Sequence, residues 1–105
     1  MSQKIITLTH YDASLIGKYD DEDYNVLCIL DTSHGIAFSV SLPDLESNND
    51  RAFAFKNLPF GSAGAVVTVS AINGQLIDGV DVSHTVTAGK FATVLTGLNT
   101  WILDA

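Results

Sequence analysis

The chain has 105 residues, the length of one domain, and its 47% hydrophobic and 16% charged residues exclude a disordered chain. Polar residues interrupt the apolar ones too often for a membrane span, and the first residues lack the basic and long apolar regions of a secretory signal. Twelve acidic and five basic residues give a net charge of −7, which repels phosphate, so we expect neither nucleic acid nor a membrane as a partner.

Residues 1–23 differ from the rest of the chain. They hold one short strand-like run, residues 5–9, and a block of four consecutive acids at residues 20–23. A block of like charges repels itself and stays hydrated, which favours a solvated loop. The alternative is an extended arm that docks on a partner. We therefore divide the chain into an N-terminal arm of residues 1–23 and a β-structured module of residues 24–105.

Strand-forming residues are abundant. Nine valines, eight isoleucines and nine threonines, which fit a pleated sheet better than a helix, make up about a quarter of the chain. Apolar and polar residues alternate over residues 36–42 and 80–86, as in a strand with one buried face. Residues 24–30 are apolar on both faces, which suits a strand buried on both sides. We expect strands at residues 5–9, 24–30, 36–42, 52–56, 66–72, 80–87, 91–96 and 100–103.

Turn-forming residues separate these runs. Asn73-Gly74 has the two residues that a type I′ turn favours, which predicts a hairpin between residues 66–72 and a short strand at residues 76–77. Further reversals are expected at Asp78-Gly79, Ala88-Gly89 and residues 97–99. The sequence thus predicts an all-β fold, a small antiparallel β-sandwich or jelly-roll-like module of about seven to eight strands. A chain this small with no disulfide is expected to assemble as an intertwined homotrimer.

Metal binding is not predicted. His10, His34 and His84 lie in three separate segments, with no pair at metal-binding spacing, and Cys28 is the sole cysteine. His84 falls on the apolar face of its strand, so we expect it in the core or at an interface, whereas His34 is expected in an exposed turn. Cys28 shares a face with apolar residues, which indicates a buried side chain rather than a reactive thiol.

No catalytic group is predicted either. Asp31-Thr32-Ser33-His34 has suitable residue types for a nucleophilic triad, but four neighbours cannot take up its geometry, so Asp31 and Ser33 are expected to accept backbone N–H groups in a turn. Asp78 and Asp81 both lie near a turn, and nothing marks either carboxyl as desolvated. Residues 61–64, Gly-Ser-Ala-Gly, lack the lysine of a phosphate-binding loop. The sequence predicts no catalytic, cofactor or metal site, and no enzyme activity.

The large aromatic residues are assigned to packing. Trp101, the sole tryptophan, is expected to fill one end of the core, with a sugar-stacking platform as the alternative. Phe53, Phe55 and Phe60 lie close together in the sequence, and the first two share a strand face. We expect this aromatic group in the core or at a subunit interface.

Several short motifs follow one another in an order that resembles short bacteriophage virion modules. The matching pieces are residues 29–33 (Ile-Leu-Asp-Thr-Ser), the alternating residues 36–42 ending in Leu42-Pro43, Phe55-Lys56-Asn57 with residues 66–69, residues 74–79 with Ile77-Asp78-Gly79, and residues 97–103 with Asn99-Thr100-Trp101. The resemblance spans residues 24–105. One departure is Thr96-Gly97, which stands where the family usually has Asp-Gly before the tryptophan.

The resemblance implies a non-enzymatic, β-structured virion part, often trimeric. Because the module is nearly the whole chain, whereas fibre proteins carry it within a longer chain, it suits a capsid decoration (cement) or head-fibre protein that stabilises the shell. Such a protein is made in the host cytoplasm and sits on the capsid surface, with two further copies of itself and the major capsid protein as partners. The alternative is a tail-tip or tail-fibre module that recognises a host surface glycan.

Overall fold

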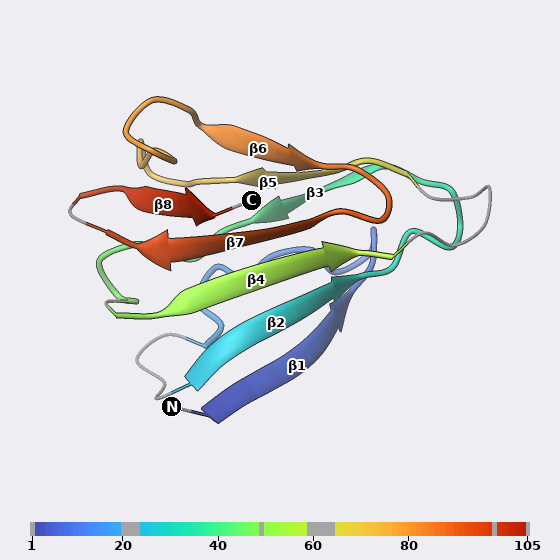
Figure 1. The fold of residues 1–105 in the computed structure, drawn as a ribbon, viewed down its shortest axis with the longest axis horizontal. Helices are drawn as coiled ribbons and strands as arrows, with labels where there is room; N and C mark the ends of the chain where they lie inside the picture. Colours follow the sequence, from blue (N-terminus) through green and yellow to red (C-terminus); the bar gives the residue numbers. More distant parts are fainter. Residues whose placement is uncertain (1, 20–23, 49, 59–64, 98, 105) are drawn as a thin grey trace.

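The structure is a computed structural model that describes residues 2–19, 24–48, 50–58, 65–97 and 99–104, and it is all-β (Figure 1). Its eight strands are β1 (Ser2–Leu8), β2 (Tyr24–Leu30), β3 (Phe38–Ser41), β4 (Ala52–Asn57), β5 (Val67–Ser70), β6 (Ser83–Val86), β7 (Phe91–Thr96) and β8 (Trp101–Asp104). The eight expected runs are all present, although β3 and β6 are shorter than the alternation predicted. The predicted all-β class is confirmed.

The strands form two mixed sheets, one of five strands in the order β1-β2-β4-β7-β8 and one of three in the order β3-β5-β6. The predicted antiparallel arrangement is wrong, because β1 and β2, β2 and β4, and β3 and β5 run parallel. Parallel neighbours need long crossover connections. The chain supplies them by passing through the other sheet between β2 and β4 and again between β3 and β5, so strands adjacent in sequence are often not paired (Figure 1).

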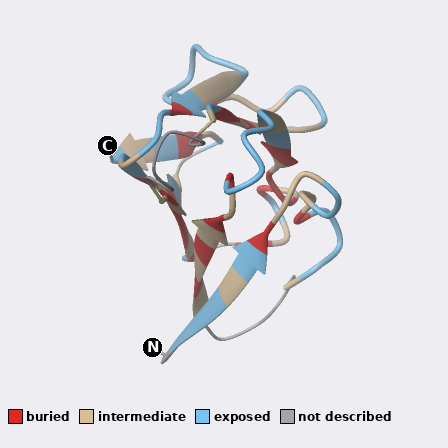
Figure 2. Cartoon of the chain, turned by 90° about the vertical axis from the view of Figure 1, so that its right-hand side faces the viewer, coloured by how far each residue is buried: buried red, intermediate tan, exposed pale blue. Residues whose placement is uncertain are grey.

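The core lies between the two sheets, and both sheets contain buried residues (Figure 2). Val26, Phe53 and Phe55 enter it from the five-stranded sheet, and Val40 and Val69 enter it from the three-stranded sheet. Each fully buried side chain of this size contributes about 1.5–3 kcal/mol relative to an exposed one. The packing of the two inner sheet faces is therefore the main source of stability.

Residues 2–19 contribute to this same core. β1 pairs in parallel with β2 along its whole length. The chain then crosses to the three-stranded sheet, where the Leu15 N–H donates to the Ser41 carbonyl at 2.9 Å, and both Leu8 and Leu15 are buried. The acidic block at residues 20–23 lies outside the described residues. The division into an arm of residues 1–23 and a module stays a prediction, but residues 2–19 are part of the folded body.

The turn at Asn73-Gly74 forms as predicted, but the hairpin does not. Both residues have positive φ, 55° and 74°, and the Gln75 N–H donates to the Ile72 carbonyl at 2.9 Å. However, β5 pairs with β3 and β6, while Ile77 after the turn forms a parallel bridge with Trp101 of β8. Local turn chemistry sets the reversal, and tertiary packing chooses the partner of the segment that follows.

The alternation at residues 80–86 misplaces two valines. Val80 and Val82 are 76% and 64% exposed, and only Val86 is buried. β6 begins at Ser83, so the two valines belong to the preceding turn and do not lie on a face of the sheet. His84 is half-buried opposite Val69 of β5, on the margin of the core rather than within it.

Candidate functional site

The structure brings two of the three histidines together. The ring centroids of His10 and His34 are 5.8 Å apart, and the Tyr11 ring lies 3.9 Å from that of His10. His10 follows β1 and His34 follows β2, and because these strands run parallel their carboxyl ends lie at one end of the sheet. Tyr11 is 87% exposed. These three residues, called the ring cluster below, therefore face solvent.

Asp31 stands beside the ring cluster, in the turn predicted there. Its Oδ1 accepts the Ser33 N–H at 3.0 Å, and the Gly35 N–H donates to the Thr32 carbonyl at 2.9 Å. Hydrogen bonds from the Ser33 side chain and backbone hold the pKa of Asp31 below its ordinary value, and the nearby imidazoles of His34 and His10 act in the same direction. Asp31 is thus an ionised turn residue, and His34 is exposed, as predicted.

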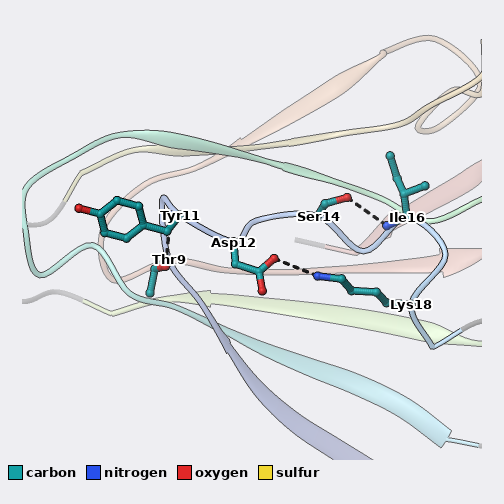
Figure 3. A network of polar contacts seen from close by, with 6 residues as sticks. All are labelled: Thr9, Tyr11, Asp12, Ser14, Ile16 and Lys18. Atoms are coloured by element: carbon teal, nitrogen blue, oxygen red, sulfur yellow. Dashed lines mark hydrogen bonds and ion pairs between the residues drawn. The ribbon is translucent and has the colours of Figure 1, made fainter.

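A local network shapes the connection that carries Tyr11 (Figure 3). Thr9 Oγ1 accepts the Tyr11 N–H at 3.3 Å, and Lys18 Nζ donates to Asp12 Oδ1 at 2.9 Å. Both partners of this ion pair are well exposed, so it contributes about 1 kcal/mol at most. The Tyr11 ring points away from the other side chains of the network, which leaves it open to a ligand (Figure 3).

Neither a metal site nor a reactive thiol is found in the described part of the chain. No group of three or more His, Cys, Asp or Glu side chains is placed there to hold an ion. Cys28 is buried, and burial raises the pKa of its thiol to about 12. The thiol is therefore protonated at neutral pH, and Cys28 is a core side chain rather than a reactive thiolate. Asp78 and Asp81 are both exposed in one turn. Residues 61–64 lie outside the described residues.

Two of the motif segments noted in the sequence meet at Thr32 and Asn57, which are both buried. The Thr32 hydroxyl donates to Asn57 Oδ1 at 3.0 Å, and Asn57 Nδ2 donates to the carbonyls of Ala65 and Val86 at 2.7 and 2.9 Å. The buried amide is thereby satisfied at both of its ends. It joins the end of β4 to β6 and to the connection that follows β2.

The two closing motifs also meet. Thr100 Oγ1 accepts the Gly79 N–H and donates to the Leu76 carbonyl, both at 2.8 Å. The Asp78 N–H donates to the Trp101 carbonyl at 2.7 Å, and Asp78 Oδ1 accepts the Leu103 N–H at 3.0 Å. The turn at residues 76–79 is thereby fixed against β8. These motif residues, Asp78 among them, have structural roles.

Trp101 is fully buried and packs edge to face on Phe53, with ring centroids 5.8 Å apart. Its predicted place in the core is confirmed, and a buried ring cannot serve as the sugar-stacking platform. Phe53 and Phe55 are both in the core, whereas Phe60 lies outside the described residues. The Trp101 Nε1–H is buried without a hydrogen-bond partner among the described residues.

No pattern in the sequence indicates a buried cation at Arg51, which is only 4% exposed. Its guanidinium donates to the Tyr24 carbonyl from Nε at 3.0 Å and from Nη2 at 2.8 Å, and from Nη1 to the Tyr19 carbonyl and Asn48 Oδ1. Arg51 thus ties the start of β4 to the segments on either side of residues 20–23. Polar loop residues precede Arg51 in the sequence. A loop with such residues can be solvated or can surround a buried arginine, so its composition does not predict which of the two occurs.

One face of the five-stranded sheet points away from the three-stranded sheet, and we call it the outward face. It consists of residues 3, 5 and 7 of β1, 25, 27 and 29 of β2, 52, 54 and 56 of β4, 91, 93 and 95 of β7, and 102 and 104 of β8. Four of its large apolar side chains are 39% to 66% exposed: Ile5, Phe91, Leu95 and Ile102. Of these fourteen residues, only Lys56 and Asp104 are charged.

A hollow of about 300 Å³ opens at one end of the outward face. Asn25, Ala52 and Leu95 line it together with Asp50, Arg51 and Thr96. Ala52 pairs with Leu95 across the sheet, and its N–H donates to Asn25 Oδ1 at 3.0 Å. The small side chain of Ala52 leaves this depression between its larger neighbours on β2 and β7.

No protein-family model, no curated protein and no solved structure matches the chain. No helix in the described residues is long and apolar enough to cross a membrane. A functional assignment therefore depends on the residues of the chain itself and on how the fold arranges them.

Proposed function

We propose that the protein is a non-enzymatic structural component of a bacteriophage virion, a capsid decoration (cement) or head-fibre protein that acts as a homotrimer on the capsid surface. Its binding to the major capsid protein adds contacts that exist only in the assembled shell, and these contacts stabilise the shell by mass action. The net charge of −7 suits a position outside the shell, away from packaged DNA.

The observation that carries this proposal is the pairing of the motif segments. The motifs that resemble phage virion modules lie far apart in the sequence, yet Thr32 binds Asn57, and Thr100 binds the turn at residues 76–79. These contacts hold distant segments of the fold together, so the motif residues have shared structural roles. The contacts support the interpretation of the motifs as one set that specifies one fold, and the proposed function is what the resemblance implies for that fold.

Co-sedimentation tests the proposal. Particles of the phage that encodes the chain are purified without this protein, mixed with it, and pelleted. We expect saturable co-sedimentation and a higher melting temperature of the particles, because ligand binding to the assembled state stabilises that state. An unrelated protein of equal net charge is the control for non-specific binding. Failure to bind, with an unchanged particle melting temperature, would contradict a role in the capsid.

A second candidate is a tail-tip or tail-fibre module that binds a host surface glycan. The observation in its favour is the ring cluster, where the exposed Tyr11 ring lies against His10, and His10 in turn is close to His34 and to the ionised Asp31. An exposed aromatic face next to hydrogen-bonding groups suits a sugar, which has an apolar face and a polar rim. Purified host polysaccharide should then bind the wild type and the Val80→Ala control, but not Tyr11→Ala. Equal binding by all three proteins would reject this candidate.

A further inference from the structure

We propose that the outward face is the surface on which copies of this chain meet, so that it forms the shared core of the homotrimer. The inference rests on the homotrimer of the proposed function and assigns the surface that the subunits use. It is independent of whether the assembled protein is attached to the head or to the tail of a virion.

The hydrophobic pattern of β2 is the first argument. Its residues are apolar on both faces, a pattern typical of strands that are covered on both sides. Within one chain only the inner side is covered: Val26 and Cys28 are fully buried, whereas Leu27 and Ile29 are only partly buried. A single copy therefore leaves the outer half of this pattern only partly covered.

The size and exposure of the outward face are the second argument. Ile5 lies on the edge strand β1, while Leu95 and Ile102 are directly paired on β7 and β8, so the apolar side chains extend across the whole sheet. Five strands spaced about 4.8 Å apart and about 20 Å long present roughly 400 Å². Eight of the fourteen residues on this face are apolar, and the face is about as large as the largest apolar patch of a typical single chain, which is often an interaction site.

Charge identifies the occupant as another copy of the chain. With a net charge of −7, two copies repel each other wherever acidic surfaces approach. The outward face carries one cation, Lys56, and one anion, Asp104, so its net charge is zero and copies can meet there without opposing charges. A basic partner would instead be drawn to the acidic surfaces. The face is therefore suited to self-association.

The shape of the face fits the same occupant. The hollow beside Ala52 and Leu95 has about 300 Å³, the volume of roughly ten water molecules, which is ample for an aliphatic side chain. Ile5 and Ile102 project from the two outer strands of the same face and are 66% and 42% exposed. A protruding side chain and a hollow at different places on one surface allow each copy both to insert and to accept, as a closed symmetric assembly requires.

The test places a carboxylate on the outward face and measures the mass of the assembly by light scattering, with no phage particles present. Leu95→Glu and Ile5→Glu each add a negative charge at an exposed position, so the fold itself should persist. Val82→Glu is the matched control, because Val82 is 64% exposed but lies in the turn before β6. Circular dichroism verifies that each variant is folded.

We expect the wild type and Val82→Glu at three times 11.2 kDa. Leu95→Glu and Ile5→Glu should weaken association by about 30-fold or more, the effect of losing one interface hot spot. A folded Leu95→Glu or Ile5→Glu protein with an unchanged mass would overturn the interface, as would a wild type that is monomeric at every concentration. Should one variant fail to fold, the other decides the question.

The experiment separates the interface from the proposed function. A dimeric wild type that both face variants convert to monomer would support the outward face as the interface and would reject the homotrimer. A trimer disrupted by the face variants that never sediments with particles would support the interface and contradict the capsid role.

Discussion

Substitutions at Trp101 test how the closing motif stabilises the core. The side chain is fully buried and packs on Phe53, and emptying a site of this size costs about 3–5 kcal/mol. Trp101→Ala should therefore lower the melting temperature by about 12 °C or more, since each kcal/mol is worth at least about 4 °C in a domain of this length. Urea unfolding at a fixed protein concentration measures the free energy directly and allows for any subunit dissociation.

Trp101→Phe separates packing from hydrogen bonding at the same site. Phenylalanine keeps an aromatic ring against Phe53 but removes the buried Nε1–H. This group has no partner among the described residues, and a buried donor left unpaired costs about 1–3 kcal/mol. The smaller ring loses packing worth about 1–2 kcal/mol, so the two effects offset each other. We expect a free energy of unfolding within about 1 kcal/mol of the wild type. An alanine variant as stable as the wild type would refute the core role, and a phenylalanine variant as weak as alanine would refute the cost assigned to Nε1–H.

Three further predictions concern buried polar groups and the first strand. Asn57→Ala removes the acceptor of the Thr32 hydroxyl and the side-chain donor to two carbonyls, and it should cost about 3 kcal/mol in urea unfolding. Adding Thr32→Val should cost little more, because their shared bond is already lost. Arg51→Lys should lower the free energy of unfolding by about 2 kcal/mol or more, because lysine cannot reproduce the planar set of guanidinium donors. A variant of unchanged stability would show that these hydrogen bonds do not stabilise the fold. Deletion of residues 2–19 should abolish the folded signal in circular dichroism, because it removes β1 and the core residues Leu8 and Leu15, and a cooperative melt of the truncated chain would contradict this.

Strand positions could be predicted from the sequence, but strand pairing could not. Residue type and hydrophobic pattern are local properties, and they located β2, β4 and β7 to within one residue. Pairing depends on where each connection crosses between the sheets, and several pairs join strands that are distant in the chain, such as β4 with β7. The Asn73-Gly74 turn shows the limit of local information, because its backbone was predicted correctly while the partner of the next segment was not.

In the candidate site, too, features set by sequence neighbours could be predicted, and features set by strand pairing could not. The burial of Cys28 and Trp101, and the turn in which Asp31 accepts a backbone N–H, follow from neighbours in the sequence, and all three were predicted. The contact between His10 and His34 requires the parallel pairing of β1 with β2, which no spacing in the sequence indicates. Arg51 was missed because its partners are mainly backbone carbonyls, and every residue has one.

The two-sided pattern of β2 shows that a sequence also contains information about assembly. A strand that is apolar on both faces predicts two covered sides, and one copy of the chain covers only one. Covering roughly 400 Å² of the outward face is worth at most about 10 kcal/mol per copy at 25 cal/mol per Å². Association itself costs about 4–15 kcal/mol, so the two quantities are comparable. An assembly held by this face alone should therefore dissociate on dilution, and its mass must be measured over a range of concentrations that includes dilute protein.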